Sequence, residues 1–211
     1  MPSTNLYRYS GLALLWGAVL GIIGNVVTNV LFPNSDPGQA QSSLVVVVTL
    51  VSLIGQVLLL MGLAGIAARQ GSQTGRLGLS GFALTFAGGL MFTSFSVMSL
   101  VIFPSLAQAA PSFFAANAPP PPAMLAFFLI ASILFGVGGL LLGIAVMRGG
   151  VLPRTAGLLV LVGAVLNAAA FPLNGLLSTI VSTVAFVVFA AGIGWIGYVM
   201  SSERRVAARL A

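Results

Sequence analysis

The chain has 211 residues, of which 59% are hydrophobic and only 5% are charged. Soluble globular domains carry about 25% charged residues, so a surface this poor in charge would not stay dispersed in water, and the composition predicts a membrane protein. The net charge of +6 comes from eight arginines and two acids. The arginines are spread along the chain and form no basic patch, so we expect no nucleic-acid partner.

Residue types that are absent limit the chemistry. The chain has no histidine and no cysteine, which removes the usual ligands of zinc, haem and iron–sulfur sites, so we expect no metal and no cofactor. It has no lysine either, and a serine nucleophile would lack the His or Lys base that activates it. The two acids, Asp36 and Glu203, are predicted on opposite sides of the membrane. We therefore expect a protein that is not an enzyme.

Long apolar segments predict an all-α bundle of six transmembrane helices in a single domain. A membrane-spanning helix needs about 20 mostly apolar residues. The first apolar run is longer than that of a signal peptide and has no small-x-small cleavage site after it, so we interpret it as an uncleaved helix. The six predicted spans are 10–32, 43–68, 77–103, 123–147, 155–171 and 175–200.

Arginines predict the orientation of these helices. All eight fall in alternate connectors or at the two ends of the chain: Arg8, Arg69, Arg76, Arg148, Arg154, Arg204, Arg205 and Arg209. Cytoplasmic loops of membrane proteins collect Lys and Arg. Both termini are therefore predicted to be cytoplasmic, with residues 201–211 forming a basic cytoplasmic tail.

The longest connector, 104–122, is uncharged and rich in Ala and Pro, with four consecutive prolines at 119–122. Such a run favours an extended polyproline conformation. The orientation above makes this segment an external loop. We interpret it as a plain spacer; a lid over an outward cavity, with Phe113 and Phe114 folded back over the helices, is the alternative.

An internal repeat relates the first and fifth spans. Gly11–Leu20 and Gly157–Leu166 are identical at seven of ten positions, and each begins three residues after an arginine. The third span starts similarly, and the even-numbered spans end alike. The pattern predicts three helical hairpins of one parallel repeat, although a chain rich in Leu, Gly, Ala and Val can also match itself by chance.

Glycines at helical spacing predict faces for helix packing. Gly17 and Gly21 form a small-xxx-small pair in the first span, and Gly139 and Gly143 form another in the fourth. Small residues let neighbouring helix backbones approach closely in membranes. We therefore interpret all four glycines as packing residues.

Polar side chains within the spans gather in the half of the membrane away from the arginines. The amides are Asn25, Asn29, Gln56 and Asn167, with Gln56 near the middle. An unpaired amide in hydrocarbon costs several kcal/mol, so these groups must face one another, a ligand or water. Two interpretations remain open: hydrogen bonds between helices, or a shallow outward-facing polar cavity that binds a ligand.

Several stretches resemble a known kind of protein. They are Gly62–Arg69, Arg76–Phe82 and Val151–Gly157, the last containing a Leu-Pro-Arg turn. The chain is similar here to small multi-spanning bacterial membrane proteins that are classed as domains of unknown function. The resemblance implies a bacterial inner-membrane location and no known activity.

Two classes of function follow from these observations. The first is a non-catalytic structural or accessory subunit, which would pack against the lipid bilayer, other membrane proteins or a second copy of itself through Gly and Ala faces. The second is a binder or transporter of a small neutral or amphiphilic molecule, which would use the polar cluster. The absence of a charged residue inside the spans favours the first class, because ion-coupled transport commonly uses such a residue.

Overall fold

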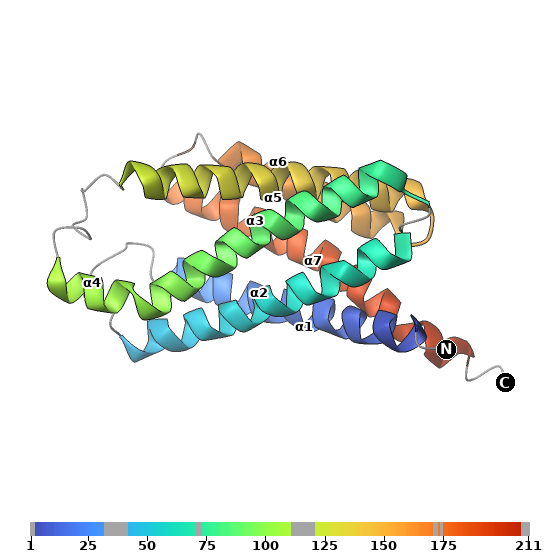
Figure 1. Ribbon diagram of the computed structural model, residues 1–211, viewed down its shortest axis with the longest axis horizontal. Helices are drawn as coiled ribbons and strands as arrows, with labels where there is room; N and C mark the ends of the chain where they lie inside the picture. Colours follow the sequence, from blue (N-terminus) through green and yellow to red (C-terminus); the bar gives the residue numbers. More distant parts are fainter. Residues whose placement is uncertain are drawn as a thin grey trace.

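A computed structural model describes residues 3–31, 42–70, 73–110, 121–170, 173 and 175–207. Over these residues the chain forms seven helices and no strand, which confirms the all-α prediction (Figure 1). Asp36, residues 111–120 of the predicted external loop and Arg209 lie outside the described part. The helices are α1 (Ser3–Leu31), α2 (Ser43–Gln70), α3 (Gly75–Val101), α4 (Phe103–Ala109), α5 (Pro122–Gly149), α6 (Arg154–Ala170) and α7 (Gly175–Ala207).

Five of these helices are long and apolar enough to cross a membrane. Their apolar segments, in α1, α2, α3, α5 and α7, are 26 to 28 residues long. Helix α6 is equally apolar in character but has only 17 residues. These lengths indicate a membrane-embedded helical bundle.

The outer surface of the bundle supports the same conclusion. Large apolar side chains point away from the protein, among them Leu79, Met61 and Ile133, with exposed fractions of 65%, 63% and 62%. A monomeric soluble protein rarely exposes a continuous apolar surface of this extent. Lipid chains would cover these residues without a solvation cost.

The six helices other than α4, here called the six long helices, pack in a closed ring. In order around the ring they are α1, α2, α3, α5, α6 and α7, and α7 packs against α1 to complete it. Each of these six helices runs antiparallel to the one before it in the ring (Figure 1). The short helix α4 packs beyond the end of α3.

One end of the ring carries the arginines, and we call it the arginine end. Arg8 lies in α1, Arg69 in the last turn of α2 and Arg76 in the first turn of α3, while Arg148 ends α5 and Arg154 begins α6. Helix α7 ends here too and includes positions 204 and 205. The first turn of α1 lies beside this end (Figure 1).

The helices extend further toward the arginine end than the apolar runs predicted. Helix α1 begins at Ser3 instead of residue 10, so Arg8 is inside the helix, and α7 continues to Ala207. Backbone hydrogen bonds of a helix do not stop where hydrophobicity stops, and long arginine side chains can reach polar surroundings from within a helix. Hydropathy therefore underestimated these two helices.

Part of the predicted external loop is also helical. Phe103–Ala109 forms α4, and Pro104 lies in its first turn, where a missing backbone N–H is harmless. Pro122, the last residue of the four-proline run, is the first residue of α5 for the same reason. The predicted spans, which ended at residue 103 and resumed at residue 123, included neither α4 nor Pro122.

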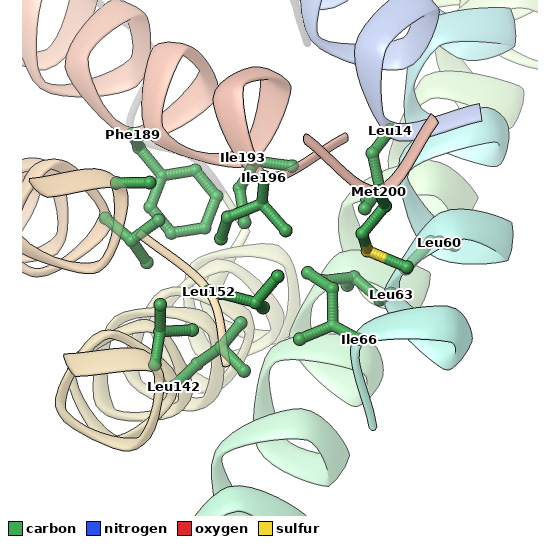
Figure 2. Packing of buried hydrophobic residues seen from close by; sticks show 13 residues of the cluster. Leu14, Leu60, Leu63, Ile66, Leu142, Leu152, Phe189, Ile193, Ile196 and Met200 are labelled. Carbon is green, nitrogen blue, oxygen red and sulfur yellow. The ribbon is translucent and has the colours of Figure 1, made fainter. Parts of the chain in front are cut away.

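The core fills the arginine half of the ring. Side chains from α1, α2, α5, α6 and α7 meet on the bundle axis, and Figure 2 shows Leu14, Ile66, Leu142, Ile193 and Ile196 among them. These five are at most 1% exposed. The ring is therefore closed by apolar side chains at its arginine end.

The turn between α5 and α6 contributes to this closure. Gly150 ends α5 with a φ of 66°, a left-handed conformation that glycine adopts without a Cβ clash. The chain then turns back, and Leu152 enters the core with an exposed fraction of 3% (Figure 2). The turn is thus anchored by a leucine between its two arginines.

Candidate functional site

A cavity of about 270 Å³ lies within the ring. Every one of the six long helices contributes to its wall. The lining residues are Asn25 from α1; Gln56, Leu59, Leu60 and Leu63 from α2; Thr85, Gly89, Phe92, Phe95 and Ser96 from α3; Phe135 from α5; Asn167 from α6; and Ser182, Phe186, Phe189 and Ile193 from α7.

The cavity extends from the middle of the bundle toward the end opposite the arginines. Thr85 lies nine residues after Arg76 along α3, which is about 14 Å at the helical rise of 1.5 Å per residue. Asn167 lies 13 residues after Arg154 along α6, or about 20 Å. The apolar core described above closes the other side, since Leu60, Leu63, Phe189 and Ile193 belong to both the core and the cavity wall.

Three of the four amides predicted from the sequence line this cavity. Asn25, Gln56 and Asn167 come from three different helices and meet around one space. Asn29, the fourth, is not among the lining residues. Its Nδ2 donates to Thr183 Oγ1 on α7 at 2.9 Å and to Asn25 Oδ1 at 3.3 Å. Asn29 thus hydrogen-bonds between helices, and the other three amides line a cavity.

Gln56 and Ser96 pair across the wall of the cavity. The Gln56 Nε2 donates to Ser96 Oγ at 3.1 Å, and Ser96 Oγ lies 3.2 Å from Gln56 Oε1 and 3.2 Å from the carbonyl oxygen of Phe92. A serine hydroxyl has one proton to donate. It can therefore satisfy only one of these two acceptors, and the amide oxygen of Gln56 is open to another donor whenever Ser96 bonds to Phe92.

Asn167 marks the mouth of the cavity. Its side chain is exposed, lies one turn before the end of α6, and has no hydrogen-bond partner among the described residues. Asn25, half-buried on α1, accepts from Asn29. Two amide groups thus offer hydrogen-bonding capacity to whatever occupies the space between them.

Aromatic rings form the apolar part of the wall. Phe92 and Phe135 contact edge to face, with ring centroids 5.8 Å apart, and Phe135 lies 5.0 Å from Phe189. Sequence reasoning missed these residues, because in a membrane protein an apolar side chain suits the lipid surface as well as an interior wall. The wall of the cavity consequently combines amide groups with aromatic rings, and no lining residue is charged.

The four predicted packing glycines all lie between helices of this chain. A Cβ at Gly17 would lie 2.7 Å from the backbone nitrogen of Leu59 on α2, and one at Gly143 would lie 2.8 Å from the carbonyl oxygen of Gly157 on α6. At Gly21 the nearest atom is Phe186 Cζ at 3.3 Å, and at Gly139 it is Phe189 Cε2 at 3.1 Å. None of the four is placed to contact a separate protein.

The arrangement is suited to binding. Uncharged amides beside aromatic rings can hydrogen-bond one part of a molecule and pack against another. The fold and the cavity together define a membrane-embedded helical bundle with an uncharged central pocket. Comparison of the chain with protein-family models, with curated proteins and with solved structures gave no match.

Proposed function

We propose that this protein binds or carries a small uncharged molecule in its central cavity. The observation that supports the proposal is the meeting of Asn25, Gln56 and Asn167, from three helices, around a space of about 270 Å³ whose wall also contains phenylalanines. Ligand sites are typically concave and mostly apolar, with a few polar groups that fix orientation. An ionised ligand would lack a counter-charge in this wall, so the ligand is neutral.

The volume limits the size of the bound group. A cavity of about 150 Å³ in another protein binds benzene, so a space of about 270 Å³ accommodates on the order of ten non-hydrogen atoms. That is enough for a small head group or a short polar molecule. It is too small for a complete membrane lipid.

We propose in addition that six helices span the membrane and that both termini lie in the cytoplasm. Helix α6 packs between α5 and α7 in the ring, and its 17 residues are about 25 Å long, against a hydrocarbon core of about 30 Å. The arginine end faces the cytoplasm under the positive-inside rule, so the cavity faces outward. A bacterial inner membrane is the expected location, on the resemblance described above.

Aromatic residues at the arginine end support this orientation. Every Trp and Tyr of the chain lies on α1 or α7, and Tyr9, Trp16, Trp195 and Tyr198 have exposed fractions between 45% and 68%. Trp and Tyr concentrate at membrane–water interfaces. They and the arginines would together anchor this end at the cytoplasmic surface.

The packing of the glycines supports three repeated hairpins, formed by α1 with α2, α3 with α5, and α6 with α7. Gly17 on α1 and Gly163 on α6 occupy equivalent positions in the sequence repeat. Each packs against the backbone of its own hairpin partner: a Cβ added at Gly17 would lie 2.7 Å from Leu59 N, and one added at Gly163 would lie 2.5 Å from Phe189 N. Gly11 and Gly157 are likewise equivalent, and each contacts the helix that precedes its own in the ring.

Native mass spectrometry of the protein extracted with its own lipids tests the binding function. The variant Ser182→Phe fills the cavity, and it removes only a hydrogen bond of Ser182 to its own helix, at Thr179 O. Ser94→Phe is the matched control, because Ser94 is exposed and also bonds only within its helix, at Leu90 O. We expect wild type and Ser94→Phe to carry a small-molecule adduct that Ser182→Phe lacks; equal adduct on all three would contradict the proposal.

A non-catalytic accessory subunit is the second candidate, and a surface groove favours it. The groove lies between α1 and α7 and is lined by apolar and aromatic residues, including Ala18, Ala191, Gly194 and Trp195. A helix of another membrane protein, or of a second copy, would fit against its small residues.

Substitution in the groove tests this second function. Ala191→Trp fills the groove, and Ala126→Trp on α5 is a matched control at another exposed alanine. If the protein acts as a subunit, the complex seen by native mass spectrometry dissociates in Ala191→Trp and persists in Ala126→Trp. A monomeric wild-type protein would exclude this function.

A further inference from the structure

The boundary between α2 and α3 differs from the other five boundaries of the ring. At each of the others, a glycine brings two helix backbones into direct contact. The distance from an added Cβ to the nearest backbone atom of the neighbouring helix shows this: 2.7 Å from Gly17 to Leu59 N (α1–α2), 2.5 Å from Gly88 to Phe135 N (α3–α5), 2.8 Å from Gly143 to Gly157 O (α5–α6), 2.5 Å from Gly163 to Phe189 N (α6–α7) and 2.7 Å from Gly11 to Gly197 O (α7–α1). Backbone atoms of the neighbouring helix leave no room for a larger side chain at any of these five glycines. The helices are therefore tightly packed at these five boundaries.

Between α2 and α3 the described residues contain no such glycine-to-backbone contact. Gly89 meets only the side chain of Leu60, whose Cδ2 would lie 2.7 Å from an added Cβ. A leucine side chain can change rotamer, whereas a helix backbone cannot withdraw without moving the whole helix. Helices α2 and α3 also pack less extensively than any other pair of neighbours in the ring.

Two hollows border this boundary, one toward each end. The central cavity takes most of its wall from α2 and α3. At the arginine end, a second hollow of about 250 Å³ lies against Ala67 of α2 and Gly78 of α3. The boundary is therefore loosely filled on both sides of the middle of the membrane.

A polar pair holds the boundary beside the cavity. Gln56 on α2 and Ser96 on α3 are joined by the hydrogen bonds of 3.1 and 3.2 Å described above, and both side chains are only half-buried. Side-chain hydrogen bonds between membrane helices are weak on average. A ligand with its own donor and acceptor can replace this pairing at little net cost.

We propose that the ligand is an uncharged amphiphile whose polar head lies in the central cavity and whose apolar chain leaves the bundle between α2 and α3 into the bilayer. This inference rests on the proposed binding function and adds the class of ligand and its path. The cavity is too small for a complete lipid but accommodates a head group, which the side-chain amides of Asn25 and Asn167 can hydrogen-bond. The apolar chain of the ligand then extends from the cavity to the bilayer through the loosely packed boundary between α2 and α3.

The experiment compares two neutral probes with the same glycerol head, the short-chain monobutyrin and the long-chain monoolein. Because the chain has no cysteine, a pair of introduced cysteines is the only reactive pair. Leu53→Cys on α2, one turn before Gln56, and Ser99→Cys on α3, one turn after Ser96, lie outside the cavity lining and leave its amides in place. After folding, this pair is bridged across α2 and α3 by a short bifunctional thiol reagent. Ala18→Cys with Gly194→Cys is the control across α1 and α7, where a Cβ at Gly194 would lie 3.1 Å from Ala18 Cβ.

Native mass spectrometry then measures both probes on each variant before and after bridging. We expect bridging of α2 to α3 to abolish the monoolein adduct and to retain the monobutyrin adduct, and bridging of α1 to α7 to change neither. Retention of monoolein after the α2–α3 bridge would overturn the proposed path while leaving the cavity as a binding site. Absence of both probes from the wild type would overturn the binding function and this inference with it.

Discussion

The Nδ2 of Asn29 on α1 donates a hydrogen bond to the Oγ1 of Thr183 on α7 at 2.9 Å, joining residues 154 positions apart in the sequence. The bond lies on the boundary that closes the ring between its first and last long helices. Asn29 also bonds to Asn25, which lines the cavity. The side chain of Asn29 therefore joins α1 to α7 and also hydrogen-bonds Asn25 in the cavity wall.

Loss of this bond should weaken the bundle slightly. Thr183→Val keeps the shape of the side chain and removes the acceptor of Asn29, so we expect a loss of about 0.6 kcal/mol in unfolding free energy, and at most about 1.7. Thr179→Val is the matched control, because the Thr179 hydroxyl is exposed and bonds only to Gly175 O in its own helix. Unfolding in mixed micelles measures both; equal losses would show that the Asn29 bond contributes nothing specific.

Replacing glycine by alanine should lower stability where another helix packs closely against the glycine and not where the space beside it is open. A Cβ at Gly163 would lie 2.5 Å from Phe189 N, whereas one at Gly136 would have no neighbouring atom within 4 Å. Gly163→Ala forces two backbones apart, and overpacking typically costs about 1–3 kcal/mol. Gly136→Ala should leave thermal stability unchanged or raise it. Similar melting temperatures for the two variants would contradict the close packing of α6 on α7.

The leucine in the α5–α6 turn should be important for stability. Leu152 is 3% exposed, and truncation of a buried leucine to alanine typically costs about 2–5 kcal/mol because it leaves a cavity. The control is Leu176→Ala, at a leucine that is 70% exposed. We expect a clear loss of thermal stability only for Leu152→Ala, and an equal effect of both would place the turn outside the core.

Thiol labelling in cells should reveal the orientation. Gln73 lies between α2 and α3 at the arginine end, and Gln108 lies in α4 at the opposite end; both side chains are exposed. In this cysteine-free chain, a membrane-impermeant maleimide added outside should label Gln108→Cys in intact cells and Gln73→Cys only after lysis. The reverse pattern would invert the proposed topology.

Much of the bundle follows from local sequence. Continuous apolar runs and arginines at alternate connectors locate the long helices and the arginine end, because lipid requires each span to satisfy its own backbone hydrogen bonds. Hydropathy missed α4 and the added turns of α1 and α7, since these segments are helical for reasons other than burial in lipid.

The site was predictable only in part. Asn25, Gln56 and Asn167 could be found because an amide deep in a span must have a partner, and the helical rise gives its depth. Asn29 is one turn from Asn25 but faces Thr183, which depends on the ring order and not on spacing. Phe135 and Phe189 look like any lipid-facing residue in the sequence, because the membrane gives apolar side chains no preferred direction.

A ligand titration of the double variant Asn25→Leu/Asn167→Leu tests the central claim most directly. With monobutyrin as the probe, wild-type protein should show a saturable rise in melting temperature, since a ligand at 100 times its Kd stabilises a folded protein by about 2.7 kcal/mol. The double variant should remain folded and lose the rise, while the control Ser94→Leu keeps it. An equal rise in all three proteins, or no rise in the wild type, would contradict a ligand site at the amide-lined cavity.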